Sequence, residues 1–169
     1  SYNVMGLKNS LPKKQSGDDD DDQCNGKGGA ISIAFLGNSI LYFNDCPRLV
    51  QHMLQQRFGT VVQDSCLRGG ATLPSLLEKG NGMKEKFQTT PAVKADGKHD
   101  TGATTVKDLL IKKWDFVVLN DHTQGPVRQK TKQATLNALR DTYSKMLQQS
   151  GATPVFLETF AYRYPNMKD

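Results

Sequence analysis

A serine, a glycine and an asparagine each follow a predicted strand, and their types suit acyl transfer. Ser39 closes the turn Gly37-Asn38-Ser39 after the apolar run Ile31–Leu36. Gly70 lies in Gly-Gly-Ala-Thr after a second strand, and Asn120 directly follows a third. A serine hydroxyl becomes a nucleophile when a base takes its proton, and the oxyanion that forms needs hydrogen-bond donors. The backbone N–H groups of Ser39 and Gly70 and the side-chain amide of Asn120 are three candidate donors.

The elements that must position these residues alternate along the chain. Apolar runs predict strands at 31–36, 60–67, 114–119 and 153–160, and helical periodicity predicts helices at 48–58, 73–79 and 129–149. This order predicts an α/β fold with a parallel sheet covered by helices. Right-handed crossovers place the carboxyl ends of all strands at one edge. Ser39, Gly70, Asn120 and the segment Glu158–Tyr162 are therefore expected to gather there.

The helix predicted at 48–58 is amphipathic. Its apolar residues recur at helical spacing and are expected to pack on the sheet: Leu49, Val50, Met53, Leu54 and Phe58. His52 lies beside that stripe, and we interpret it as a partly exposed surface histidine.

Two segments offer little to a core. Residues 1–29 are polar and include five adjacent carboxylates, Asp18 to Asp22, so they are predicted to form a disordered tail or linker. Residues 80–108 show almost no apolar periodicity and are predicted to be a surface loop or insertion, with one helical turn around 83–87. The domain is therefore assigned to residues 30–169.

Composition narrows the class of protein. The 169 residues carry a net charge of +5, but no aromatic-basic interleaving is present, so no nucleic-acid partner is expected. Neither a membrane-spanning helix nor a signal peptide is predicted, and the cellular compartment stays open. Cys24, Cys46 and Cys66 form no C-x-x-C pair, which argues against a zinc site. Unpaired thiols and a single Cys46–Cys66 bridge both stay open, and no cofactor is indicated.

The three donor positions resemble the first three conserved blocks of the SGNH (GDSL-like) hydrolase superfamily. Gly37-Asn38-Ser39, Gly70 and Asn120 match in order and in placement after successive strands, and the resemblance covers residues 30 to about 165. It implies a flavodoxin-like three-layer α/β/α sandwich, with Ser39 as nucleophile and first oxyanion donor and Gly70 and Asn120 as the others. Family members are mainly esterases, lipases and carbohydrate-ester deacetylases, so a small-molecule or carbohydrate ester is the implied substrate.

Three departures from the family pattern bear on the chemistry. Asn38 stands where the family has Asp, and Val118-Leu119-Asn120-Asp121 lacks a glycine but keeps the asparagine. The family's catalytic Asp-x-x-His follows a further strand near the C-terminus, and this chain ends before that region. We therefore expect the N-terminal portion of such a domain, without its last strand, last helix and general base.

Other histidines are weaker candidates for the base. Asp96-Gly97-Lys98-His99 is literally Asp-x-x-His but precedes the Asn120 block, and His122 lies two residues after Asn120, where a loop histidine beside the pocket is the simpler interpretation. Without a base, the oxyanion donors and binding give at most about 10³–10⁴ over water, so the chain is expected to be almost inactive on simple esters. Tyr162 and the 80–108 loop are expected to shape specificity.

Two non-enzymatic interpretations stay open. The Gly-Asn-Ser and Gly-Gly turns could hold a phosphate in a flavodoxin-like binding or regulatory module, although no G-x-G-x-x-G or P-loop follows a strand. The second non-enzymatic interpretation is an inactive SGNH-like domain that binds carbohydrate or serves as a scaffold. Reaction with a serine-directed fluorophosphonate distinguishes the enzyme from the binding module, and the sequence downstream of residue 169 tests the inactive domain.

Overall fold

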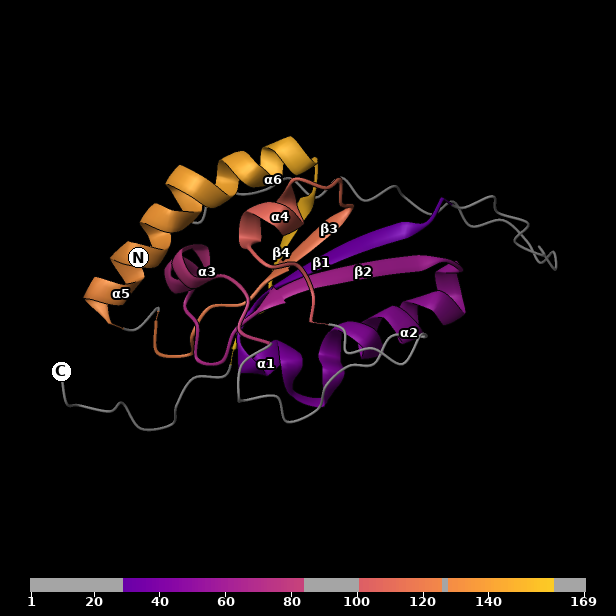
Figure 1. The fold of residues 1–169 in the computed structure, drawn as a ribbon, viewed down its shortest axis with the longest axis horizontal. Coiled ribbons are helices and arrows are strands. Elements are labelled where there is room, and N and C mark those ends of the chain that lie inside the picture. The colour runs from indigo at the N-terminus through magenta and orange to yellow at the C-terminus, as the bar shows by residue number, and fades with distance from the viewer. Residues whose placement is uncertain (1–28, 84–100, 126–127, 160–169) are drawn as a thin grey trace, which may run out of the picture.

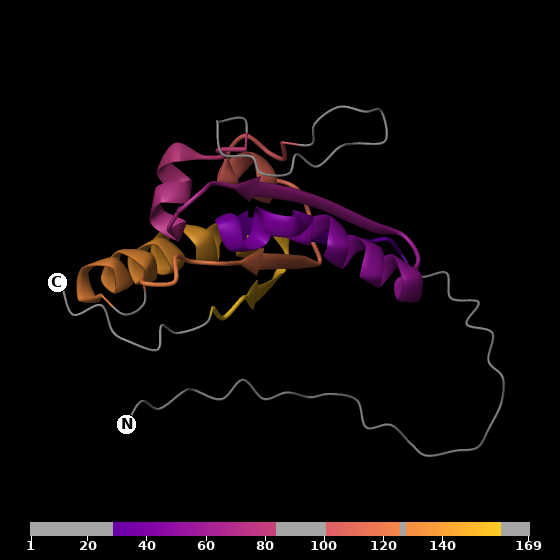
Figure 2. The same cartoon turned by 90° about the horizontal axis from the view of Figure 1, so that it is seen from below.

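A computed structural model of the protein describes residues 29–83, 101–125 and 128–159. Within these ranges four parallel strands form one sheet in the order β2-β1-β3-β4, so β2 and β4 lie at opposite edges (Figure 2). The strands are β1 (Ile31–Gly37), β2 (Val61–Leu67), β3 (Phe116–Leu119) and β4 (Thr153–Phe156). The predicted α/β fold with a parallel sheet is confirmed.

Helices cover both faces of the sheet and complete three layers (Figure 1). On one side lie α1 (Ser39–Tyr42), the 3-10 turn η1 (Phe43–Asp45) and α2 (Cys46–Phe58). On the other lie α3 (Leu73–Lys79), α4 (Val106–Leu110), α5 (Gln129–Ala138), the π-helical segment η2 (Leu139–Tyr143) and α6 (Ser144–Ser150). The arrangement is consistent with a flavodoxin-like three-layer sandwich.

The central strand β1 separates two hydrophobic cores. Because side chains alternate along a strand, Ala34 and Leu36 enter the core under α3 and α4, and Ile33 and Phe35 enter the core under α1 and α2. A strand covered by helices on both faces reads as a continuous apolar run, which is why β1 is visible in the sequence.

Helix α2 differs from the prediction in the face that it buries. It begins at Cys46, two residues before the predicted start, with Pro47 in its first turn, and it ends at Phe58 as predicted, with Gly59 as its C-cap. Val50 and Leu54 pack on the core, but Leu49, Met53 and Phe58 are 56%, 62% and 49% exposed. The expectation that all five apolar residues face the sheet is wrong. Periodicity identifies a helix, but it does not show how wide a stripe the sheet covers.

Helix α4 begins inside the stretch predicted to be a loop, residues 80–108, and extends two residues beyond it. Thr105 caps it, since its hydroxyl accepts a hydrogen bond from Asp108 N at 3.0 Å and the Asp108 carboxylate accepts one from Thr105 N at 3.1 Å. Val106, Leu109 and Leu110, which belong to this helix, are buried. This Thr-x-x-Asp capping box before an apolar pair is a signal in the sequence that could have identified the helix.

The long helix predicted at 129–149 is present but irregular. A π-helical segment, η2, separates α5 from α6, and Gly151 ends the run in a left-handed conformation at φ +76°. Tyr143, at the end of η2, is fully buried and donates a hydrogen bond from its hydroxyl to the Leu73 carbonyl at 3.0 Å. This contact joins the long helix to the start of α3.

Several other expectations can be placed. Cys46 and Cys66 are free thiols, so the bridge between them is excluded. The described part of the chain contains no helix long and apolar enough to cross a membrane. Residues 1–28, His99 and Tyr162 lie outside the described ranges, so the tail and the roles given to these two residues stay predictions.

Candidate active site

The turn after β1 lies directly against the end of β3. A Cβ atom on Gly37 would lie 2.9 Å from Asn120 Cβ and 3.0 Å from the Asn120 carbonyl oxygen, closer than side chains approach in proteins. Glycine at this position therefore allows the two strand ends to meet. The Asn120 N–H also donates to the Leu36 carbonyl at 2.9 Å, which continues the β1–β3 pairing into the site.

Asn38 is almost fully buried and bonds in two directions. Its Oδ1 accepts a hydrogen bond from Ile40 N at 3.2 Å and caps α1, while its Nδ2 donates to the Ala71 carbonyl at 3.0 Å. The second bond needs a donor, which an ionised aspartate does not have. The amide at position 38 therefore joins the Ser39 turn to the turn that contains Gly70.

Ser39 is the first residue of α1 and is partly exposed at the carboxyl end of β1. The sequence places it in a turn before a later helix, and the structure starts the helix at the serine itself. Among the described residues, no histidine or carboxylate forms a hydrogen bond with its hydroxyl. The Ser39 hydroxyl is thus on a partly exposed residue, and none of these groups is bonded to it.

Gly70 lies in a turn joined to the end of β1. Arg68 N donates to the Gly37 carbonyl at 3.0 Å, and Ala71 N closes the turn by donating to the Arg68 carbonyl at 3.2 Å. Gly70 has a left-handed φ of +64° and is exposed. Such a conformation favours glycine and leaves the backbone accessible to a ligand.

Asn120 is 1% exposed and contacts the Gly37-Asn38-Ser39 turn. Its Oδ1 accepts a hydrogen bond from Asn38 N at 3.4 Å, and its Nδ2 donates to the Asp121 carbonyl at 3.0 Å. An amide nitrogen carries two hydrogens, so the contact to Asp121 leaves one for a ligand oxygen. The side chain is thus already oriented by its neighbours.

Asp121 connects the site to two helices. Its Oδ1 accepts hydrogen bonds from Leu73 N at 3.0 Å and His122 N at 2.8 Å, and its Oδ2 accepts one from the Thr135 hydroxyl at 2.7 Å. The sequence does not predict that Asp121 connects these helices. Its only signal there is the position of a carboxylate directly after the candidate donor Asn120.

His122 is partly buried, and its Nδ1 accepts a hydrogen bond from Gln124 N at 3.3 Å. This bond places the ring proton of a neutral imidazole on Nε2. His122 lines a cavity of about 450 Å³ between α5 and the ends of β3 and β4. The cavity has mainly apolar walls, with Asp121, Lys132 and Glu158 as charged members, and neither Ser39 nor Gly70 lines it. The structure therefore brings Asn38, Asn120 and the Gly70 turn together and places His122 beside a separate cavity.

No metal centre is formed within the described ranges, because no three His, Cys, Asp or Glu side chains gather at one point there. The polar groups at the strand ends are mainly amides and backbone N–H groups, which suit an anion better than a cation.

Comparison with known proteins gives a structural relative. No protein-family model and no curated protein matches the chain. A crystal structure of a DUF4886 family protein from Bacteroides uniformis ATCC 8492 matches with a TM-score of 0.54 and 19% sequence identity. The likeness is one of fold. It covers 82% of this chain and 54% of the other, so this chain spans about half the length of its relative.

Proposed function

We propose that this chain carries the nucleophile and the oxyanion donors of an SGNH-type serine hydrolase that acts on acyl or acetyl esters. The observation that supports the proposal most is the bonding between the three turns. Asn38 bonds to both Asn120 and Ala71, and Arg68 N bonds to Gly37, so the segments with Ser39, Gly70 and Asn120 form one cluster at the carboxyl edge of the sheet.

In the proposed reaction the Ser39 hydroxyl oxygen attacks the ester carbonyl as a base takes its proton. The carbonyl oxygen becomes an oxyanion, which accepts hydrogen bonds from Ser39 N, Gly70 N and Asn120 Nδ2. The alcohol then leaves with a proton, and water hydrolyses the acyl-serine. Each donor is worth about 10²–10³ in rate because it stabilises charge that develops only in the transition state.

Neither described histidine is assigned as the general base, because His52 is exposed on α2 and His122 lines the separate cavity. If Ser39 has no base beside it, the chain should respond to a small base added in solution, because the segments with the proposed nucleophile and donors lie in one cluster.

Imidazole rescue tests this proposal. We expect weak hydrolysis of p-nitrophenyl acetate by the wild-type chain, at most about 10³–10⁴ over water. Added imidazole should raise this rate above the hydrolysis by imidazole alone, and Ser39→Ala should abolish the increase. Ser144→Ala, which removes a partly exposed hydroxyl on α6, is the matched control and should leave the increase intact.

The binding-module alternative stays open, and the mainly apolar cavity beside His122, which neither Ser39 nor Gly70 lines, offers a second place for a ligand. If imidazole produces no Ser39-dependent rate and a fluorophosphonate probe leaves Ser39 unmodified, the hydrolase proposal is wrong. Retention of a bound carbohydrate or phosphate ligand would then favour the alternative.

A further inference from the structure

Gly70 stands on a loop that is closed at its base. Gly82 N donates to the Leu67 carbonyl at 2.9 Å, so the chain that leaves the end of β2 returns to it after α3. The Gly70 turn and helix α3 lie between these two points. We refer to residues 67–82 as the donor loop.

The side chain of Arg68 spans this loop. Its Nε donates to the Gly80 carbonyl at 2.9 Å, and one terminal nitrogen, Nη2, donates to the carbonyls of Lys79 at 3.2 Å and Asn81 at 3.4 Å. The carbonyls at the end of a helix lack intrahelical partners and carry partial negative charge. A planar, charged guanidinium with several fixed donors suits such a cluster better than an ammonium does.

The backbone of Arg68 contacts the other end of the same loop. Its N–H donates to the Gly37 carbonyl, and its carbonyl accepts the hydrogen bond from Ala71 N that closes the Gly70 turn. One residue therefore contacts the end of β1, the Gly70 turn and the far end of α3.

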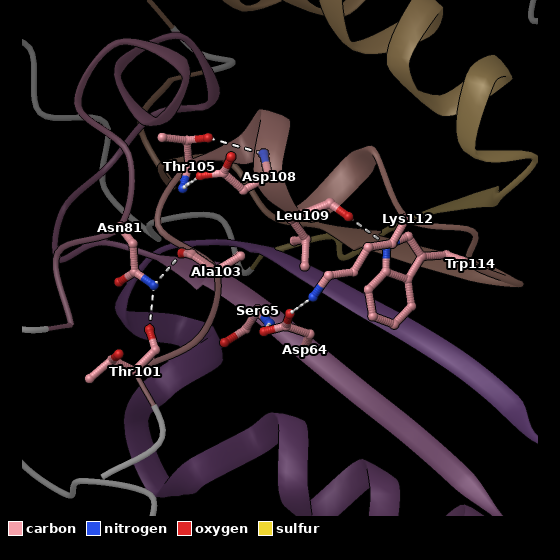
Figure 3. A network of polar contacts seen from close by, with 10 residues as sticks. All are labelled: Asp64, Ser65, Asn81, Thr101, Ala103, Thr105, Asp108, Leu109, Lys112 and Trp114. Atoms are coloured by element: carbon pink, nitrogen blue, oxygen red, sulfur yellow. Dashed lines mark hydrogen bonds and ion pairs between the residues drawn. The ribbon is translucent and has the colours of Figure 1, made fainter.

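Asn81, whose carbonyl accepts a hydrogen bond from Arg68, is itself held in place by its side chain. Asn81 Nδ2 donates to the carbonyls of Thr101 and Ala103, as Figure 3 shows, and Asn81 Oδ1 accepts a hydrogen bond from Met83 N. Ala103 N in turn donates to the Ser65 carbonyl on β2 at 2.7 Å. The guanidinium thus bonds to the end of the donor loop, and the Asn81 side chain ties that end to a segment anchored on the sheet.

Gly70 is exposed. Apart from its own atoms and those of its two chain neighbours, no heavy atom lies within 4 Å of the place where its Cβ would be. On this side, therefore, only the two ends of the donor loop are available to orient Gly70.

We propose that Arg68 is a positioning residue that orients the Gly70 N–H toward the oxyanion by closing the donor loop. This inference rests on the proposed hydrolase function. It assigns Arg68 no contact with substrate, so its effect should appear in the turnover step and in the motion of Gly70.

Arg68→Met tests the role, because it keeps much of the aliphatic stem and removes the guanidinium donors. We expect the ¹H–¹⁵N heteronuclear NOE of Gly69 and Gly70 to fall. In the imidazole-supported assay, kcat should fall at least about tenfold with KM unchanged, because a misplaced oxyanion donor loses transition-state stabilisation. Arg68→Lys keeps the positive charge but lacks the planar set of guanidinium donors. It should lower the NOE and kcat as well, but by less than Arg68→Met does.

Lys112→Met is the matched control, since it removes the exposed ion pair of Lys112 with Asp64 at 2.7 Å and leaves the donor loop intact (Figure 3). It should leave the NOE and kcat unchanged. An unchanged NOE at Gly70 in folded Arg68→Met contradicts the positioning role, whatever the activity. If Arg68→Met does not fold, wild-type values in Arg68→Lys contradict it instead. Absence of Ser39-dependent turnover in the wild type overturns the hydrolase function, while the NOE still decides whether Arg68 orders Gly70.

Discussion

At the scale of the single residue, Cys66 shows how burial changes chemistry. It lies on β2 with no exposed surface, and burial raises the pKa of its thiol to about 12, with Asp64 adding to the effect. A thiol reacts through its thiolate, so Cys66 should resist alkylation by iodoacetamide in the folded chain at pH 8. Mass spectrometry of the Cys66 peptide before and after unfolding measures this. Equal modification in both states would contradict the burial.

The same pKa shift gives a dependence of stability on pH. The pKa of the thiol is 9.0 when it is exposed to solvent in the unfolded chain and about 12 in the folded one, so the folded state retains the proton between these values. The contribution of this thiol to the free energy of unfolding is therefore fully present below about pH 9, and it is lost as the pH rises toward 12. In urea titrations from pH 8 to pH 10.5, the free energy of unfolding should fall more steeply with pH for the wild type than for Cys66→Ala. Parallel plots of this free energy against pH would contradict the raised pKa of Cys66.

Asn38 shows what a residue pattern can and cannot predict. Its place in the Gly-Asn-Ser turn was visible in the sequence, as was its difference from the aspartate in the SGNH superfamily pattern that this turn resembles. The donor role toward the Ala71 carbonyl could not, because Ala71 lies 33 positions away in the sequence. Only the parallel pairing of β1 with β2 brings the two turns together.

At the scale of the element, Asp121 couples the end of β3 to α3 and α5. Its carboxylate accepts bonds from Leu73 N, at the start of α3, and from the Thr135 hydroxyl on α5. Hydrogen bonds to charged groups contribute about 1.5–3 kcal/mol each to stability. Removing the Asp121 carboxylate takes away the acceptor of these partly buried donors. We expect Asp121→Ala to lower the free energy of unfolding by at least about 2 kcal/mol in urea titrations.

Asp141→Ala is the control for this prediction, because Asp141 is exposed and pairs with its neighbour Arg140. Its effect should stay within about 0.5 kcal/mol. Equal losses in the two variants would show that Asp121 does not couple the elements.

The elements themselves divide into those that the sequence predicts well and those that it misses. Helix α3 carries its own signals, Thr72 as cap and Pro74 in the first turn, and the structure confirms it from Leu73 to Lys79. Helix α4 has five residues, too few for a visible apolar period, so only its capping box marks it. The π-helical segment η2 has no sequence rule that we could apply, and tertiary packing of Tyr143 accompanies it.

At the scale of the whole molecule, the order of strands and helices was enough to predict the parallel sheet and its carboxyl edge. Chain order alone did not show which strand is peripheral. Strand β4 lies at one edge, and Val155 and Phe156 are 41% and 58% exposed. Apolar composition predicts a buried strand, so the exposure of β4 is a property of the assembled sheet.

The direction of the β4 hydrogen bonds explains part of this edge. Thr153 N and Leu157 N donate to the Asp115 and Leu119 carbonyls on the β3 side. Because N–H groups alternate along a strand, the backbone nitrogens of Pro154 and Phe156 face away from β3. Proline has no N–H to offer, and it is common on edge strands because it limits pairing with another chain. Within the described part of the chain no acceptor is found for the Phe156 N–H, and this residue also has a large, exposed apolar side chain.

We therefore expect the chain to self-associate through this edge as its concentration rises. Phe156→Lys should shift sedimentation-velocity profiles toward the monomer, because a charged side chain on an edge strand opposes edge-to-edge pairing. Phe43→Lys, at a residue 47% exposed on the opposite side of the sheet, is the control and should leave the profile unchanged. If both variants behave like the wild type, association does not run through β4. If both dissociate it equally, general surface hydrophobicity rather than the open edge is the cause.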